Sequence, residues 1–109
     1  MYEEFIAKRV AELREKAGVS AREMSLDIGQ NGSYVNRIEN GKSLPSVQGL
    51  LYICEYLKVT PAEFFSEDNR DPVMLKELYK DICLLTPEQM RIIHDIVLSI
   101  KKLDEIKPQ

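Results

Sequence analysis

The stretch "QNGSYVNRIENGKSLPS", residues 30–46, decides the fold. Val35 and Ile38 have the spacing of residues on the buried side of a helix. Gly41 ends this helix, and Asn31 is placed to cap its start. A helix of about two turns is too short to be stable alone. We therefore expect a short helix that packs on its neighbours through two apolar side chains and presents polar side chains outward.

Two helices are predicted ahead of this stretch. The first is indicated by apolar residues spaced by three or four positions: Ile6, Val10, Leu13 and Ala17. Ser20 and Glu23 have the spacing of a capping box and open the second helix. Gly18 and Gly29 end the first and the second helix. The second helix is thus joined to the short third helix by a tight turn.

Two further helices are predicted after it. Ser46 is placed to cap a fourth helix. The buried stripe of that helix is expected to contain Val47, Leu50, Leu51, Cys54 and Leu57. Thr60 and Glu63 have capping-box spacing, with Pro61 at the first helical position. They open a short fifth helix that carries two phenylalanines.

The rest of the chain is predicted to form two longer helices. The polar segment 66–71 is expected to be a linker, and Pro72 begins a sixth helix. The apolar stripe of this helix is Leu75, Leu78, Ile82 and Leu85. Thr86 and Gln89 form a further capping box, which opens a last helix through about Leu103. No segment alternates with period two over a useful length, so we expect no sheet.

Composition and charge restrict the class of protein. The chain has 109 residues and a formal net charge of −3, so its bulk charge does not favour a polyanionic partner. Binding to nucleic acid would need a local basic face. No apolar run approaches the roughly 20 residues that cross a bilayer, and the acidic, amphipathic N-terminus is not a signal peptide. We expect a cytoplasmic protein that does not bind membranes.

The sequence offers no catalytic or metal-binding constellation. Cys54 and Cys83 lie in apolar periodic stretches and are expected to be buried free thiols. His94 lies beside an apolar face and has no partner at metal-ligand spacing. There is no nucleophile–base pair and no phosphate-binding loop. We therefore predict no enzyme, no metal and no cofactor.

The segment "GVSAREMSLDIGQNGSYVNRIENGKSLPSVQGLLYICEYLKVTPAEFF" resembles the helix-turn-helix domain of the lambda-repressor-like, Cro/cI/Xre family. The likeness covers roughly residues 3–65. It rests on Gly18, the capped helix at Ser20, Gly29 in the turn, the block "YVNRIENGKSLPS" and the ending "LKVTPAEFF". The resemblance implies an all-α fold. We expect a five-helix DNA-binding domain at residues 1–66 and a C-terminal two-helix hairpin at residues 67–109.

The resemblance also implies a function. It points to a sequence-specific DNA-binding transcriptional regulator, a repressor that binds a palindromic operator in double-stranded DNA as a homodimer. The expected DNA-binding residues are Ser20, Arg22, Asn31, Gly32, Ser33, Tyr34, Asn36, Arg37, Asn40, Lys42 and Ser43. Arg37 can contact guanine O6 and N7, and Asn36 can pair with adenine. Lys42 and Tyr34 are expected at phosphates, although Tyr34 could instead pack over a helix end.

In this family, an ion pair often links the first helix to the recognition helix, and Arg14 and Glu39 occupy the matching positions. We expect this pair to be structural, because a short helix needs an anchor that fixes its angle.

Two departures from the family pattern favour an alternative function. Gly32 has no side chain where relatives often carry a base-reading residue, and Ala21 replaces a common glutamine. Met24 and Ser25 stand in place of the usual leucine and alanine. The alternative is a protein-interaction adaptor or antitoxin-like module with a degenerate helix-turn-helix.

The last helix carries two neighbouring apolar stripes, which is more than one partner helix can cover. We expect a dimer interface at Ile92, Ile93, Ile96, Val97, Ile100 and Leu103. Two alternatives remain. These residues could pack on the first and fifth helices, or a regulatory protein could bind them.

Overall fold

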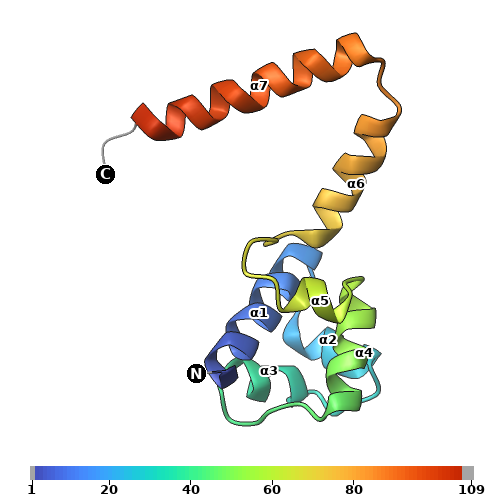
Figure 1. Cartoon of the computed structure of the whole chain (residues 1–109). Coiled ribbons are helices and arrows are strands. Elements are labelled where there is room, and N and C mark those ends of the chain that lie inside the picture. Colours follow the sequence, from blue (N-terminus) through green and yellow to red (C-terminus); the bar gives the residue numbers. More distant parts are fainter. Residues whose placement is uncertain (1, 107–109) are drawn as a thin grey trace. The chain divides into compact units, whose positions relative to one another are not determined.

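The computed structural model describes residues 2–106, and it describes side chains for residues 2–104 (Figure 1). Over this range the chain forms seven helices and no strand, which confirms the all-α fold class. The helices are α1 Tyr2–Ala17, α2 Ala21–Asp27, α3 Tyr34–Glu39, α4 Val47–Leu57, α5 Pro61–Phe64, α6 Pro72–Cys83 and α7 Pro87–Ile106. The chain divides into two compact units, residues 1–73 and residues 74–109.

The first unit packs α1 to α5 around one core. Helix α3 contacts both α1 and α2, and α4 contacts α1 and α5. The buried core residues are Val10, Leu13, Met24, Val35, Ile38, Ile53, Cys54, Leu57, Val59 and Phe64. Val35 and Ile38 are thus buried, as their spacing predicted. The six residues of α3 are stabilised by this packing and not by the length of the helix.

The buried stripe of α4 differs from the predicted one. Val47 is 79% exposed and Leu51 is 48% exposed, whereas Ile53, which the prediction omitted, is fully buried. Each step along a helix turns by about 100°. Leu51 is therefore turned by about 100° from Leu50, which faces the core, and lies at the edge of the stripe. Val47 lies seven residues before Cys54, on nearly the same side of the helix, but it begins the helix, beyond the part of the stripe that the core covers.

Most of the predicted hydrogen bonds that cap the helix starts are present. Ser46 caps α4 through its side chain. Thr60 and Glu63 form both bonds of a capping box, at 2.8 and 3.1 Å. At α2 only the first half of the box forms: Ser20 Oγ accepts from the Glu23 backbone N–H at 3.0 Å.

The segment 66–71, expected to be a linker, is fastened to α1. Arg9 is buried, and its guanidinium donates to the carbonyl oxygens of Phe64 at 2.7 Å and Asn69 at 2.5 Å. Lys16 Nζ donates to the Arg70 carbonyl at 2.7 Å. The proline that begins α6 is also buried. The first unit therefore includes this segment.

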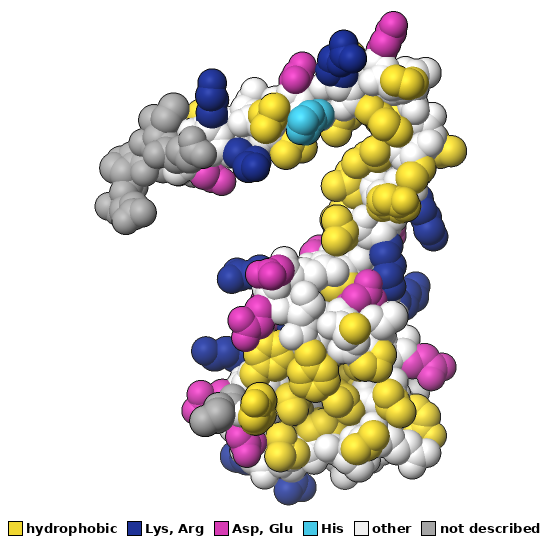
Figure 2. All heavy atoms as spheres, viewed as in Figure 1, with side chains coloured by type: hydrophobic (Ala, Val, Ile, Leu, Met, Phe, Trp, Pro, Cys, Tyr) yellow, Lys and Arg dark blue, Asp and Glu magenta, His cyan; other side chains and the backbone are white. Residues whose placement is uncertain are grey.

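Helices α6 and α7 leave most of their apolar side chains exposed (Figure 2). The six α7 residues expected at an interface are between 37% exposed, at Ile93, and 61% exposed, at Leu103. Leu75 and Leu78 of α6 are also about half exposed. The two helices were expected to form a hairpin, which stays a prediction; the exposed fractions show only that neither apolar face is fully covered. Two helices alone do not surround a core. Each can cover only part of the other's broad apolar face, and the rest of that face stays exposed to water.

The second unit differs from expectation in two further details. Helix α7 opens with the predicted box between Thr86 and Gln89, at 3.0 and 3.2 Å, and continues past Leu103 to Ile106. Cys83 is exposed and not buried, because it ends α6, whose apolar face is uncovered. Cys54 is buried, and burial raises the pKa of its thiol.

No helix in the described residues has both the length and the apolar character to span a membrane.

Candidate nucleic-acid interface

Helix α2, the turn after it and α3 form a compact surface. Gly29 takes φ of 80° in the turn, a backbone conformation that glycine adopts at little cost. The next residue, Gln30, donates its N–H to the Ser25 carbonyl at 2.9 Å. Because α3 buries Val35 and Ile38, its remaining residues face outward or flank the core.

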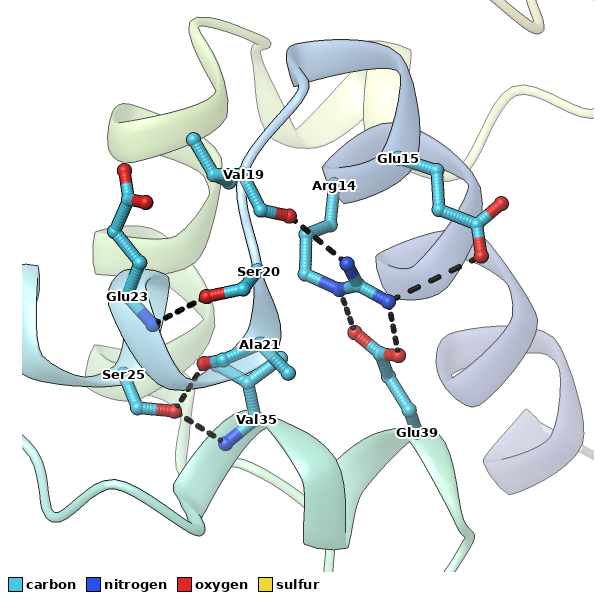
Figure 3. A network of polar contacts seen from close by, with 9 residues as sticks. All are labelled: Arg14, Glu15, Val19, Ser20, Ala21, Glu23, Ser25, Val35 and Glu39. Atoms are coloured by element: carbon cyan, nitrogen blue, oxygen red, sulfur yellow. Dashed lines mark hydrogen bonds and ion pairs between the residues drawn. The ribbon is translucent and has the colours of Figure 1, made fainter.

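The start of α3 is capped from the neighbouring helix. Ser25 of α2 is fully buried, and its Oγ accepts from the Val35 N–H at 2.9 Å (Figure 3). The same hydroxyl donates to the Ala21 carbonyl at 2.7 Å. The first amides of a helix have no partner within the helix, so this bond satisfies one of them. Ser25, noted from the sequence only as a departure, thus joins α2 to α3.

Asn31 is not the N-cap that the sequence predicted. The helix begins after Ser33, whose side chain makes no capping bond. Asn31 Oδ1 instead accepts from both the N–H and the hydroxyl of Ser33, at 3.1 and 2.8 Å. The Asn31 side chain thereby shapes the turn, as short polar side chains often do, while Ser25 takes the capping role.

The Arg14 and Glu39 side chains form a two-pronged ion pair between α1 and α3 (Figure 3). Arg14 Nε donates to Glu39 Oε2 at 2.6 Å, and Arg14 Nη2 donates to Oε1 at 3.0 Å. Arg14 Nη1 also donates to the Val19 carbonyl at 2.9 Å. The hydrogen bond to Glu39 raises the pKa of Arg14, against the opposing effect of burial. The pair therefore fixes the angle at which α3 leaves the core.

A hydrogen bond between side chains also joins α2 to α4. Tyr56 of α4 donates its hydroxyl to Asp27 Oδ2 at 2.8 Å. This bond raises the pKa of Tyr56 to about 12 from an ordinary 10.0, because the neutral phenol is the donor.

Tyr34 packs over the first turn of α4, the alternative that the sequence left open. It is half-buried and packed against the core, and burial raises its pKa. A Cβ added at Gly49 would lie 2.5 Å from the Tyr34 hydroxyl. The absent side chain at Gly49 therefore makes room for the tyrosine.

The remaining residues expected at DNA lie on this surface or in the loop after it. Ser20, Arg22, Asn31, Ser33, Asn36, Arg37, Asn40 and Lys42 are exposed, while Gly32 and Ser43 are half-buried. Among residues 20–43, the cations are Arg22, Arg37 and Lys42. The acids are Glu23, Asp27 and Glu39, of which Glu39 is occupied by Arg14 and Asp27 by Tyr56.

Helix α2 is held at its last residue, Asp27, by the hydrogen bond from Tyr56. A tight turn follows, and the short helix α3 is anchored to the core. This arrangement defines a helix-turn-helix module. The chain belongs to the helix-turn-helix domain family, whose model matches residues 6–64. This match confirms the helix-turn-helix resemblance and is consistent with a Cro/cI/Xre-like domain. No curated protein and no solved structure matches the chain. A helix-turn-helix domain indicates a DNA-binding regulator.

Proposed function

We propose that the protein is a sequence-specific transcriptional repressor that binds a palindromic operator as a homodimer. One observation carries this proposal. Helix α3 is fixed by its two buried residues, by Ser25 and by the Arg14–Glu39 pair, yet it leaves Asn36, Arg37 and Asn40 exposed. A helix held this firmly, with polar side chains on its outer face, is suited to reading base edges.

Helix α3 would enter the major groove, which is about 12 Å wide and admits one helix. Arg37 would donate two hydrogen bonds to guanine, and Asn36 would pair with adenine. Lys42 and Ser43, in the loop after α3, would contact phosphates and set the register of the protein on the duplex. Ser20, at the start of α2, and Ser33 would add short polar contacts to the backbone or to base edges.

Two copies would be needed for a specific operator, because one short helix reads only a few base pairs. Two-fold-related copies place their recognition helices about 34–36 Å apart, in successive turns of the major groove. The exposed apolar residues of α7 suit the contact between copies: Ile92, Ile93, Ile96, Val97, Ile100 and Leu103. Association would remove this surface from water.

Capture of fragmented genomic DNA by the purified protein, followed by sequencing, tests the proposal. A two-fold-symmetric sequence should be enriched. Its affinity should fall by orders of magnitude between about 50 and 200 mM salt, because phosphate contacts release counterions. A flat salt response with no enriched sequence would contradict DNA binding.

The adaptor function is the second candidate, favoured by the exposed apolar surface of α6 and α7, by the missing side chain at Gly32 and by Ala21, which stands in place of a common glutamine. It predicts no enriched DNA and stable capture of a protein through the C-terminal helices. In that case the α3 substitution Arg37→Ala would leave partner binding unchanged.

A further inference from the structure

We propose that Arg22, which belongs to α2, reads the base that α3 cannot reach at Gly32. Its guanidinium would contact a guanine at the edge of each half-site and so extend the sequence read by Arg37. This inference rests on the proposed DNA-binding function and assigns a specificity-determining role within it.

The side chain of Arg22 lies directly over Gly32. A Cβ built on Gly32 would be 2.5 Å from Arg22 Nη1, 3.2 Å from Cζ and 3.5 Å from Cγ. Contact this close does not occur between real atoms of these kinds. Any residue other than glycine at position 32 would therefore displace the arginine from its place.

The backbone does not explain the glycine. Gly18, Gly29 and Gly41 take positive φ, but Gly32 does not. An ordinary residue could adopt the backbone of Gly32, and glycine has a cost in conformational entropy. The space above Gly32 is instead occupied by the guanidinium, which would shift if a side chain were added there.

The guanidinium is also available to a ligand. Arg22 is exposed, and within the described residues its side chain makes no ion pair and no hydrogen bond. By contrast, Arg9 and Arg14 use their donors within the protein. All five N–H donors of Arg22 remain for an external acceptor.

The location selects the acceptor. Gly32 lies just ahead of α3, at the end of a recognition helix that contacts base edges. A planar guanidinium with two parallel donors matches guanine O6 and N7. Arg37 is five positions further along the chain and nearer the far end of α3, so the two arginines would read different base pairs.

A double-mutant cycle tests this assignment. Arg22→Ala, Gly32→Ala and the double variant are compared with wild type for binding to the enriched operator and to duplexes that carry every single-base change. Arg22→Ala should weaken operator binding about 5- to 100-fold and abolish the preference at one base pair in each half-site. Gly32→Ala should abolish the same preference, because its methyl group displaces the guanidinium. In the Arg22→Ala background, Gly32→Ala should have no further effect.

Three controls separate the explanations. Arg22→Lys keeps the charge but not the two-donor fork, so it should retain non-specific binding and lose the base preference. Lys8→Ala removes an exposed charge on α1 and should leave the base preference intact. Melting temperatures of the Arg22 and Lys8 variants should match wild type, because only exposed side chains are changed, and that of Gly32→Ala should be no lower, because Gly32 does not take positive φ.

Uniform weakening on all duplexes by Arg22→Ala would show a phosphate contact and overturn the assignment. An unchanged base preference in Gly32→Ala would also overturn the assignment, because the arginine would then read the base without occupying the space over Gly32. Wild-type protein that enriches no DNA would instead overturn the proposed function, and this inference with it.

Discussion

At the scale of single residues, one hydroxyl sets the start of the recognition helix. Ser25 lies in the core and links the Ala21 carbonyl of α2 to the Val35 N–H of α3. No other side chain caps α3 in the described structure, because the Ser33 side chain makes no capping bond. The position of α3 therefore depends on an atom from its neighbour.

Replacing Ser25 with alanine should destabilise the first unit by about 1–3 kcal/mol, since the buried Val35 N–H would lose its acceptor. For a unit of this size, each kcal/mol lowers the melting temperature by about 4–8 °C. Ser99→Ala is the matched control, because Ser99 makes the same kind of bond to a carbonyl, Asp95 O, on an exposed helix. Thermal unfolding followed by circular dichroism would measure both. Equal effects of the two substitutions would contradict the capping role.

Replacing Arg14 with alanine should also lower stability, because it leaves the largely buried Glu39 carboxylate without its charged partner. We expect a loss of about 1–3 kcal/mol, together with weaker DNA binding as α3 loosens. Arg37→Ala is the control: it should weaken binding without changing the melting temperature, since Arg37 is exposed. A melting temperature unaffected by Arg14→Ala would show that solvent screens the pair fully.

Tyr56 predicts a pH dependence. Its pKa is raised to about 12, so its contribution to stability is complete below the ordinary value of 10.0 and is lost as pH rises through about 12. A tyrosinate absorbance titration should show that Asp27→Asn moves one of the five tyrosines to lower pH. If the titration curves of wild type and Asp27→Asn coincided, Asp27 would not be the cause.

At the scale of elements, α7 has one broad apolar face, which is the surface expected between copies. Ile96 and Leu98 have similar exposure, 50% and 45%, but lie on different sides of the helix. Ile96 belongs to the set expected between copies, and Leu98 does not. The two residues therefore allow a matched comparison within one helix.

Ile96→Asp should convert the proposed dimer to a monomer at tens of micromolar concentration, because it places a charge within the apolar contact. Leu98→Asp should leave the dimer intact. Sedimentation equilibrium would report the mass of each variant, and circular dichroism would show whether the first unit remains folded. The dimer assignment fails if wild type sediments as a monomer or if both substitutions act alike.

Elements were predictable where their signals are local. The Thr60 and Thr86 capping boxes need only residues three positions apart, and both formed. The contacts of Ser25 with Val35, and of Arg9 with Asn69, join residues 10 and 60 positions apart. Periodicity carries no information on such pairs, so neither could be predicted. The buried residues of α4 were predicted only in part for a related reason. Periodicity indicates which face of a helix is apolar, but it does not indicate where along the helix the core ends.

At the scale of the whole molecule, the boundary of the first unit lies beyond the residues that resemble the family. Arg9 donates to the Phe64 carbonyl, just before the segment 66–71, and to the Asn69 carbonyl within it, and it also forms a salt bridge with Glu12. Because these partners belong to the first unit, the polar segment is part of the folded structure rather than a free connection.

A chain ending at Val73 should therefore unfold cooperatively and be more stable than one ending at Phe65, by about 1–3 kcal/mol. The shorter chain loses the Asn69 acceptor of the buried Arg9 and the buried proline at the start of α6. Urea denaturation of the two fragments would measure the difference. Equal midpoints would mean that the segment adds nothing to the fold.

The close fit of Tyr34 over Gly49 has a consequence for genetics. Gly49 lies in α4, and its neighbour Tyr34 is the first residue of α3. A larger residue at position 49 would force the tyrosine hydroxyl aside and disturb the packing of the first residue of α3. In a selection for lost DNA binding, substitutions at this buried position would appear together with those at exposed α3 residues. A phenotypic map alone would then assign a DNA contact to a residue that is buried within the first unit.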